Sequence, residues 1–371
     1  MRYYLIAGER SGDLHGGNLL RSLSRYDTEM TARGFGGDDM KAAGMELAVH
    51  YNQLAFMGFV AVIANLRRIG SLIRQCKQDI TQFKPDVIIL IDYAGFNMRI
   101  AKFAKASGVR VFYYISPKVW AWNTGRAWKL KALVDRMFCI LPFEKDFFRK
   151  FDWDVDYVGN PVLDSVRQFH RDPEFVNGNQ LQPGGKIVAL LPGSRKMELT
   201  RMIPMMAQVA RDHPQYQFVV AAVRTLPDSL YAPFRGMVNV KLIFDSTYDL
   251  LSVSTAAIVT SGTATLETAL FGVPQAVIYR AGYLEMKLLR FLVKVKFISL
   301  PNLVADELVI REFIQEDMNS ANLNAELDRI IELGPYRDKM LAGYKKIRQL
   351  LDTGSASENA ARLMTGYLKK K

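Results

Sequence analysis

The sequence predicts an α/β protein built from two consecutive Rossmann-like, doubly wound domains that face a cleft. Short apolar runs rich in Val and Ile alternate with longer amphipathic stretches along the whole chain, as buried parallel strands alternate with the helices that cover them. The length of 371 residues suits two domains at roughly 100–200 residues each. Hydrophobic residues make up 49% of the chain, which is enough for two sizeable cores.

The first series of elements begins with a short buried strand at 3–7 and ends with a strand at 109–115. In between, we predict a Gly-rich loop at 8–17, a helix to about residue 25, a turn-rich loop at 32–37, a helix at 63–83, a strand at 87–91, a turn at 93–97 and a helix at 98–107. This order of elements is typical of a doubly wound domain.

The second series follows a boundary between residues 160 and 185, where the segment 171–182 is polar and carries Gly, Pro and Asn. We predict strands at 187–191, 217–222, 240–243, 256–260 and 275–279, helices at 197–212, 248–252 and 263–270, and further helices after about residue 306. The domains are therefore 1–163 and 164–345.

The composition indicates which cellular compartment and which kinds of binding partner we expect for this protein. A formal net charge of +12 implies anionic partners such as lipid headgroups or phosphorylated substrates. No nucleic-acid-binding motif is present, so nucleic acid is not expected. Cys76 and Cys139 do not make a disulfide framework or a metal-ligand spacing, and no signal peptide or membrane span is evident. We expect a cytoplasmic protein without a transmembrane anchor.

Ligands of parallel sheets bind beyond the carboxyl ends of the strands, so the residues that follow strands are the first candidates. After the strand at 187–191, Gly193 permits close backbone approach, Ser194 can cap a helix, and Arg195 offers a planar fork for phosphate. The alternative is a plain strand-to-helix turn with a surface arginine.

A second loop follows the strand at 256–260. Ser261 and Thr263 flank Gly262 at a helix start, and free amides there would bind a diphosphate. Glu267, about one turn further, would accept hydrogen bonds from ribose hydroxyls. Ordinary helix capping is the alternative for this loop alone, but the two loops together favour a nucleotide diphosphate site. Neither loop is a Walker motif.

In the first domain, Asp92 follows a very apolar strand, and partial desolvation there would suit a general base. Capping of the next helix or pairing with an arginine is the alternative. The Gly-rich loop lacks the dinucleotide spacing and fits an acceptor site better. His15 in that loop is more often structural than catalytic.

Three segments mix apolar or aromatic side chains with cations, namely 54–74, 117–131 and 287–296. Such mixtures suit an anionic membrane interface. The alternative for any one of them is a core helix with a solvated charged face.

An ordered set of short motifs resembles the lipid A disaccharide synthase family. The matching segments are Ala7–Asp13, Met57–Phe59, Ile91-Asp92 with Phe96-Asn97, Ser116–Trp122, Val158–Pro161, Leu191–Arg195, Ser261–Glu267 and Leu300–Asn302. Each motif is weak alone, but the set keeps the family's order over nearly the whole chain.

The resemblance implies an inverting glycosyltransferase of the GT-B class. It implies transfer of 2,3-diacylglucosamine from UDP-2,3-diacylglucosamine to 2,3-diacylglucosamine 1-phosphate, giving the β-1,6-linked lipid A disaccharide 1-phosphate and UDP. The UDP-sugar is a substrate, and no cofactor or metal is expected. The protein would work peripherally on the inner face of the inner membrane of a Gram-negative bacterium, and an oligomer is compatible with this. In this class the C-terminal helix returns to the first domain, here residues 346–371.

The resemblance also assigns residues. Asp92 matches the family's candidate base. The positions expected to hold UDP are Gly193, Ser194, Arg195, Ser261, Gly262, Thr263, Thr265, Glu267, Asn302 and Gln315, and those on the acceptor side are Glu9, Ser11, Asp13 and Asn97.

The chain departs from the family's pattern at two places. Ala94-Gly95 stands where the family usually has Pro-Asp, so a second carboxylate beside Asp92 is missing, and Arg311 stands where the family tends to have Pro. Two other functions remain open at this stage. One is a UDP-N-acetylglucosamine 2-epimerase or a transferase with a soluble acceptor. The other is a non-catalytic protein of the membrane surface.

Overall fold

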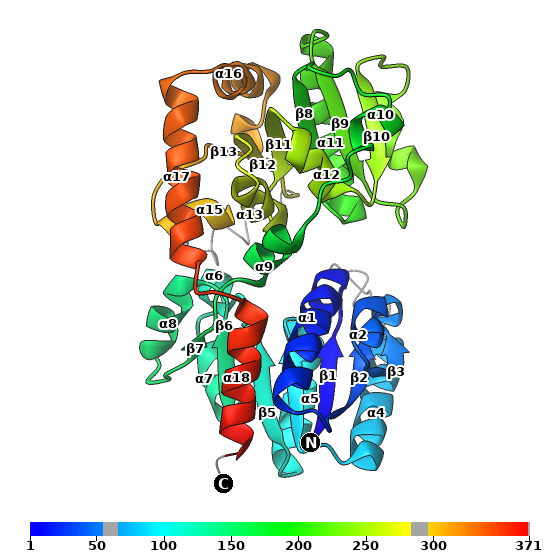
Figure 1. Ribbon diagram of the computed structural model, residues 1–371, viewed down its shortest axis with the longest axis vertical. Coiled ribbons are helices and arrows are strands. Elements are labelled where there is room, and N and C mark those ends of the chain that lie inside the picture. Colours follow the sequence, from blue (N-terminus) through cyan, green and yellow to red (C-terminus); the bar gives the residue numbers. More distant parts are fainter. Residues whose placement is uncertain (55–65, 283–295, 370–371) are drawn as a thin grey trace. The chain divides into compact units, whose positions relative to one another are not determined.

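The chain divides into two compact units in a computed structural model that describes residues 1–54, 66–282 and 296–369. The first unit is Met1–Pro161 together with Asp352–Lys371, and the second is Val162–Leu351 (Figure 1). We expected the boundary at 163 and the return at 346. The return starts later because the helix α17 (Pro335–Leu351) stays with the second unit, where Arg348 donates to the carbonyl of Leu270 at 3.1 Å.

The first unit contains a parallel sheet of seven strands in the order β3-β2-β1-β4-β5-β6-β7. The strands are β1 (Arg2–Ala7), β2 (Thr31–Gly36), β3 (Glu46–His50), β4 (Val87–Ile91), β5 (Arg110–Tyr114), β6 (Arg136–Cys139) and β7 (Asp156–Tyr157). The helices are α1 (Arg10–Tyr26), α2 (Asp38–Ala42), α4 (Leu66–Phe83), α5 (Ala94–Ala106), α6 (Val119–Trp122), α7 (Arg126–Leu133), α8 (Pro142–Arg149) and α18 (Ala356–Lys369), with a 3₁₀ turn at Tyr51–Gln53.

Alternate residues of these strands feed two separate cores, because successive side chains of a strand point to opposite faces. Tyr4 and Ile6 join a cluster that includes residues of α4, α5 and α7. Tyr3 and Leu5 join another that includes residues of α1 and α18. Helix α18 packs against α1 (Figure 1), so the last helix of the chain completes a core begun by the first strand.

The second unit contains a parallel sheet of six strands in the order β10-β9-β8-β11-β12-β13. The strands are β8 (Ile187–Leu191), β9 (Gln217–Ala222), β10 (Val240–Phe244), β11 (Ala256–Thr260), β12 (Gln275–Tyr279) and β13 (Glu312–Ile314). Besides α17, the helices are α9 (Pro161–Gln168), α10 (Phe175–Gly178), α11 (Lys196–Asp212), α12 (Thr247–Val253), α13 (Thr263–Leu270), α15 (Leu300–Ala305) and α16 (Ser320–Ile331), with 3₁₀ turns at Asp228–Phe234 and Gln315–Asp317. The prediction of two doubly wound α/β domains is confirmed.

Three segments expected to be irregular are regular. Most of the Gly-rich stretch 8–17 lies inside α1, where Gly12, Gly16 and Gly17 are buried. The stretch 32–37 is strand β2 up to Gly36. Gly34 is needed there because a Cβ would lie 1.9 Å from the carbonyl oxygen of Leu5 on β1. The expected turn at 93–97 is largely the first turn of α5. In the first two segments, glycines that mark close packing resembled turn residues.

The chain crosses between the units at two places that are tied together within the first unit. The carbonyl of Val158 accepts hydrogen bonds from Thr353 Oγ1 and Asn359 Nδ2, both at 3.2 Å. A Cβ at Gly159 would lie 2.1 Å from Thr353 Oγ1. The outgoing and returning segments are therefore joined side by side.

Both sheets reverse their strand order at one point, between β1 and β4 in the first and between β8 and β11 in the second. Ala7 pairs with Ile91, and Leu191 pairs with Val259. Such switch points are where doubly wound sheets bind ligands. Within each unit, the fold therefore brings together the strand-end segments that the sequence singled out.

Candidate functional site

In the second unit, the start of α13 presents open backbone amides beside β11. The amides of Gly262, Thr263 and Ala264 have no hydrogen-bond partner within the described ranges. A Cβ at Gly262 would meet nothing closer than the Thr260 carbonyl oxygen at 4.0 Å, so an incoming group can approach the backbone. Unpaired amides at a helix start, together with the helix dipole, favour an anion.

Beneath this helix start lies a buried hydroxyl without a partner. Thr260, the last residue of β11, is 4% exposed, and its Oγ1 makes no hydrogen bond to any described residue. Buried polar groups are normally satisfied. The end of β11 therefore holds unused hydrogen-bonding capacity next to the open amides.

The neighbouring loop after β8 is arranged differently, because Glu198 of α11 occupies its amides. Glu198 Oε2 accepts from the amides of Ser194 at 3.0 Å and Arg195 at 3.2 Å. Gly193 has φ +104°, and a Cβ there would lie 2.3 Å from the same oxygen. The Arg195 guanidinium is 53% exposed and lies 3.5 Å from Glu198 Oε1. The loop therefore offers the Arg195 side chain to an anion, while Glu198 holds its backbone.

Glu267 lies on the same face of α13 as Thr263, four residues earlier and about 6 Å away along the axis. It is half-buried, and burial raises the pKa of its carboxyl. The hydroxyl of Tyr248 donates to Glu267 Oε1 at 2.9 Å. The carboxylate is thus held by one tyrosine, one helical turn beyond the open amides.

Three other residues predicted to hold UDP use their side chains within the protein. Ser261 Oγ donates to the carbonyl of Ile298 at 2.9 Å, and Thr265 Oγ1 to that of Gly262 at 2.7 Å. The amide of Gln315 makes two 3.2 Å bonds to the backbone of Ala281.

Asn302 is fully buried, and both ends of its amide are engaged. Its Nδ2 donates to Ile310 O at 2.8 Å and to Glu312 Oε1 at 2.9 Å. Its Oδ1 accepts from the amides of Val309 and Ile310, both at 2.9 Å. This geometry makes Asn302 a residue that shapes the loop before β13.

In the first unit, β4 is followed by two consecutive residues with left-handed backbone. Asp92 has φ +45° and Tyr93 has φ +46°. A pair of non-glycine residues in this region is uncommon and costs energy, so the surroundings must impose it. The carbonyl of Asp92 accepts from Asn97 Nδ2 at 2.8 Å and also from the hydroxyl of Tyr113. Asn97 is fully buried, so it supports the turn from beneath.

The end of β1 lies against this turn. A Cβ at Gly8 would lie 2.4 Å from the ring of Tyr93, whose hydroxyl donates to the carbonyl of Leu54 at 2.7 Å. Burial, followed by the nearby Glu9 carboxylate, raises the pKa of Tyr93. Glu9 and Asp92 therefore follow adjacent strands and flank one tyrosine.

The other acceptor-side candidates lie on α1 and differ from one another. Ser11 is exposed in the first turn. Asp13 is 2% exposed and accepts from the backbone amides of Gly37, Asp39 and Met40 at 2.7, 3.0 and 3.1 Å. It thereby caps α2. Burial lowers the pKa of His15 to about 4, and its Nδ1 has no partner among the described residues, so His15 is neutral at pH 7.

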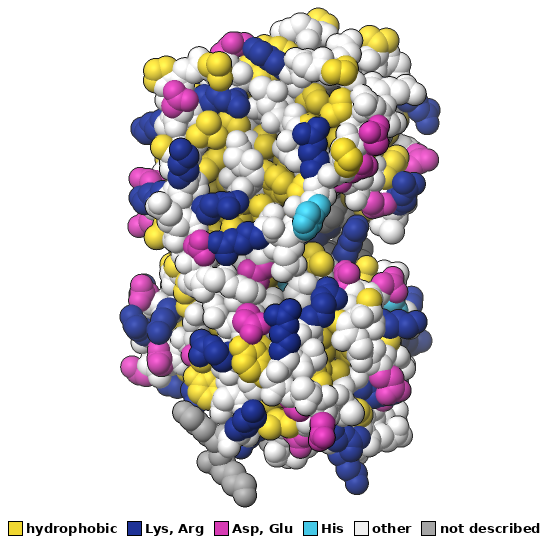
Figure 2. Space-filling model, in the orientation of Figure 1, with side chains coloured by type: hydrophobic (Ala, Val, Ile, Leu, Met, Phe, Trp, Pro, Cys, Tyr) yellow, Lys and Arg dark blue, Asp and Glu magenta, His cyan; other side chains and the backbone are white. Residues whose placement is uncertain are grey.

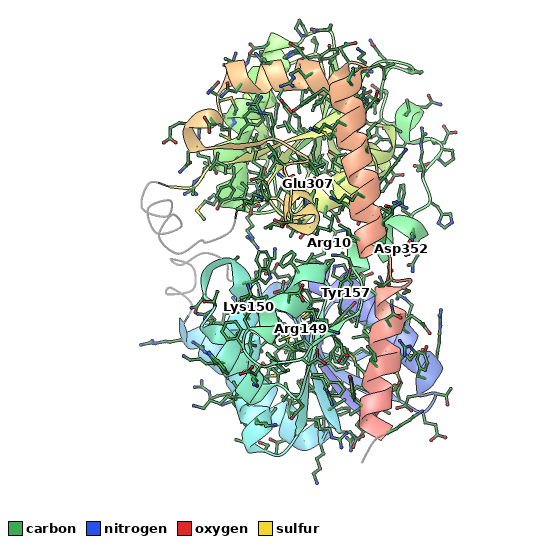
Figure 3. All side chains as sticks on the ribbon, turned by 90° about the vertical axis from the view of Figure 1, so that its left-hand side faces the viewer. Arg10, Arg149, Lys150, Tyr157, Glu307 and Asp352 are labelled. Atoms are coloured by element: carbon green, nitrogen blue, oxygen red, sulfur yellow. The ribbon has the colours of Figure 1, made fainter. Side chains whose placement is uncertain are left out.

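Of the three apolar and basic segments, two lie mainly outside the described residues, at 55–65 and 283–295. The third forms a Trp128 patch, which we define as Trp128, Lys129 and Lys131 of α7 with Lys150 and Phe151 after α8. Trp128 is 52% exposed, and its ring meets that of Phe151 edge-on at 5.5 Å. Lys131 Nζ lies 5.5 Å from the Trp128 ring centroid. Figure 3 labels Lys150 at the end of α8.

The basic charge is otherwise dispersed. Figure 2 shows Lys and Arg side chains interleaved with Asp and Glu on both units. Within the described ranges no helix is long and apolar enough to cross a bilayer. No three His, Cys, Asp or Glu side chains in those ranges come together as a metal site would require.

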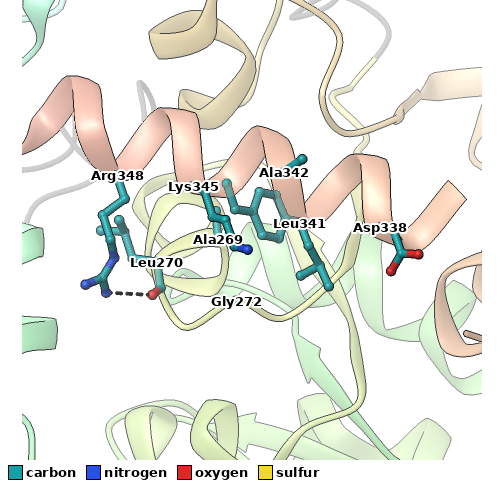
Figure 4. A pocket seen from close by; sticks show the side chains of 9 residues that line it. Ala269, Leu270, Gly272, Asp338, Leu341, Ala342, Lys345 and Arg348 are labelled. Atoms are coloured by element: carbon teal, nitrogen blue, oxygen red, sulfur yellow. Dashed lines mark hydrogen bonds between the residues drawn. The ribbon is translucent and has the colours of Figure 1, made fainter. Parts of the chain in front are cut away.

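A groove elsewhere on the second unit lies between α13 and α17 (Figure 4). Its α13 side is formed by Ala269 and Leu270, at the carboxyl end of that helix. Lys345 and Arg348 of α17 line it, and Arg348 already donates to the carbonyl of Leu270. The negative end of the α13 dipole points here, so an anionic ligand is favoured at the opposite end of the helix.

Several residues with a structural part in the site were missed by the sequence reasoning. They are Tyr113, Glu144, Glu198 and Tyr248. Glu144 is 1% exposed and holds Ser116 and Trp120 of a recognised motif. Glu198 carried a usable signal, since a glutamate at the third helical position commonly caps the helix start. No comparable signal marked the two tyrosines, because their hydrogen-bond partners are distant in sequence.

Comparison with known proteins identifies the family. The family model for lipid-A-disaccharide synthetase matches residues 3–364. A lipid-A-disaccharide synthase of Geobacter metallireducens is 39% identical over 376 residues, covering 100% of this chain and 98% of its own. One of Coxiella burnetii is 34% identical over 364 residues, covering 97% and 96%. The chain belongs to the lipid-A-disaccharide synthase family.

Solved structures agree on the fold. The UDP-GlcNAc 2-epimerase of Neisseria meningitidis has a TM-score of 0.68 at 14% identity, covering all of both chains. The glycosyltransferase of kitacinnamycin has a TM-score of 0.66 at 14% identity, covering 99% of each chain. These identities establish the GT-B fold alone. Together with family membership, this makes the chain a glycosyltransferase of lipid A disaccharide formation, and the resemblance read from the motifs is confirmed.

Proposed function

We propose that the chain transfers 2,3-diacylglucosamine from UDP-2,3-diacylglucosamine to the 6-hydroxyl of 2,3-diacylglucosamine 1-phosphate, with inversion at the anomeric carbon. The products are the β-1,6 lipid A disaccharide 1-phosphate and UDP. The observation that carries the proposal is the start of α13, where open amides are followed one turn later by Glu267. This spacing suits a diphosphate followed by a ribose.

In the proposed step, Asp92 takes the proton of the acceptor hydroxyl. The hydroxyl oxygen forms a bond to the anomeric carbon as the bond from that carbon to the UDP oxygen breaks. The departing diphosphate carries the electron pair, and the amides at the start of α13 and the Arg195 guanidinium stabilise its charge. A single displacement inverts the anomeric carbon. With Ala94 and Gly95 beside it, Asp92 acts without a second carboxylate in its turn.

The remaining predicted residues divide by their geometry. Gly193, Ser194 and Thr263 lie at the proposed nucleotide site, and Glu9 and Ser11 on the acceptor side. Ser261, Thr265, Asn302 and Gln315 shape the nucleotide site through their internal hydrogen bonds. Asn97 and Asp13 shape the acceptor side in the same way.

The test is to incubate the purified protein with both lipid substrates and to measure UDP and disaccharide. Asp92→Asn should lower turnover by about 10²–10⁴-fold while UDP still binds. Asp146→Asn is the control, because Asp146 is exposed and pairs only with Arg149 on the surface in the described structure. If turnover of the Asp92 variant is unchanged, Asp92 is not the base. If UDP binds and the wild type forms no disaccharide, the protein is a non-catalytic binder.

We also propose that the protein works on the cytoplasmic face of the inner membrane of a Gram-negative bacterium. The acyl chains of both substrates need an apolar surface rimmed by cations. The net charge of +12 and the exposed Trp128 patch support this location.

The fold likeness to UDP-GlcNAc 2-epimerases motivates a second arm of the same experiment. UDP-GlcNAc is supplied without lipid, and the sugar is examined for inversion at carbon 2. Under the proposed function no epimer forms. Epimer formation at full rate without a lipid acceptor would favour the epimerase.

A further inference from the structure

Tyr248 has no catalytic or binding role in the proposed reaction, yet its hydroxyl meets the Glu267 carboxylate. The Oη–H group donates to Oε1 at 2.9 Å. Among the described residues, Tyr248 is the one recorded hydrogen-bond partner of the Glu267 side chain, and Oε2 makes no bond to any of them. One oxygen is therefore engaged by the protein and the other is left for a ligand.

The tyrosine is itself fixed by an aromatic cluster drawn from three separate segments. The Tyr248 ring lies edge-on to Phe271 at 5.0 Å and to Phe169 at 5.7 Å, and the two phenylalanines meet at 5.5 Å. Edge-to-face aromatic packing restricts ring position, so the direction of the Tyr248 hydroxyl is set before any ligand arrives.

We propose that Tyr248 is a positioning residue, which orients Glu267 so that its second oxygen accepts hydrogen bonds from the ribose of the nucleotide donor. The inference rests on the proposed function, because it takes Glu267 as the ribose contact. An ionised carboxylate accepts hydrogen bonds at both oxygens, and those bonds are stronger than the ones that a neutral carboxyl group accepts. Tyr248 donates to the carboxylate and so favours the ionised form, against the opposing effect of burial.

The arrangement also gives the site a reason to discriminate between sugars. A buried acceptor that is oriented toward a hydroxyl loses a bond when that hydroxyl is absent, so a deoxyribose is disfavoured. The choice between ribose and deoxyribose should therefore depend on Tyr248 as well as on Glu267.

The test measures equilibrium binding of UDP, 2′-deoxy-UDP and 3′-deoxy-UDP to the full chain. The wild type should bind at least one deoxy analogue about 10-fold more weakly than UDP, as expected for a hydrogen bond to a charged group. Tyr248→Phe keeps the ring packing and removes the hydroxyl. The variant should bind UDP about 5–10-fold more weakly than the wild type does. It should bind the deoxy analogue as tightly as the wild type does, so the preference for ribose is lost.

Tyr231→Phe is the matched control. Tyr231 is a buried tyrosine of the same unit whose hydroxyl accepts from the Val223 amide at 2.9 Å, away from Glu267. This variant should keep the full preference for ribose even if its thermal stability falls. In turnover assays, Tyr248→Phe should raise KM for the UDP-sugar and leave kcat unchanged. As the pH is lowered, UDP binding by the Tyr248→Phe variant should start to weaken at a higher pH than UDP binding by the wild type does.

The outcomes separate the inference from the proposed function. If Tyr248→Phe weakens UDP and both analogues equally, or changes none of them, Tyr248 is structural and the inference is overturned. If the wild type binds UDP without distinguishing the deoxy analogues, Glu267 is not the ribose contact and that part of the proposed function fails first. If the wild type does not bind UDP, the whole nucleotide site is refuted.

Discussion

Replacing Asp13 with asparagine tests whether this residue serves the acceptor or the fold. The carboxylate accepts three backbone amides, two at Oδ1 and one at Oδ2. Asparagine keeps an acceptor for two of them without the charge, and it sets an NH₂ group against the amide of Asp39. Losing charge assistance and leaving one partly buried donor unpaired should cost about 2–4 kcal/mol. For a domain of this size, that lowers Tm by roughly 5–15 °C.

The assay compares urea unfolding with turnover at a temperature where both proteins are folded. Asp13→Asn should shift the urea midpoint and keep kcat/KM per folded molecule within about 3-fold of the wild type, less than the about 10-fold cost of a typical lost contact. Asp38→Asn is the control, because the Asp38 side chain is 94% exposed in the same first turn of α2, and it should change stability by at most about 0.5 kcal/mol. An Asp13 variant with wild-type stability and collapsed turnover would refute the capping role and make Asp13 a substrate contact.

Three further predictions concern other parts of the molecule. Asn302→Ala should lower the free energy of unfolding by about 2–4 kcal/mol because it removes a saturated buried amide; a fall in UDP affinity without a fall in Tm would contradict this. Trp128→Ala should weaken binding to anionic vesicles about 5-fold or more, with Leu333→Ala, which removes a side chain that is 89% exposed in the second unit, as the unaffected control in the same co-sedimentation assay. Burial raises the pKa of Glu267, so its contribution to stability is full below the ordinary glutamate pKa and is lost as pH rises through the raised one. The unfolding free energy of the wild type minus that of Glu267→Gln should therefore fall as the pH rises above the ordinary glutamate pKa of about 4.3, and a difference that does not change with pH would argue against the raised pKa.

Long apolar runs made most of the fold predictable. The strands at 187–191 and 256–260 were predicted at their observed bounds, because a buried parallel strand is a continuous apolar run with turn residues on either side. Strands β7 and β13 were missed because two or three residues carry no periodicity. The glycines of α1 and β2 were misread as turn residues, because glycine serves close packing and turns alike.

The site was predictable in location and less so in the use of each side chain. Strand ends at a switch point follow from the element order, which placed Asp92, Arg195 and Gly262. Whether a polar side chain is free or engaged depends on partners far away in sequence. Asn302 is engaged by residues 7 to 10 positions away, and Asp13 by amides 24 to 27 positions away. Those distances are set by the fold, so the sequence alone did not separate binding residues from structural ones.

The tie between Val158 and the returning segment at Thr353 and Asn359 has a consequence for biosynthesis. In sequence, the second unit is an insertion between the seventh strand of the first unit and its last helix. On the ribosome, the whole second unit emerges before α18 does, and domains fold as units during synthesis. The core that holds Tyr3 and Leu5 therefore keeps one face uncovered until Ala360, Ala361 and Met364 have been synthesised, which happens after the second unit is complete. A chain stopped at residue 351 would release a complete second unit attached to an unfinished first one.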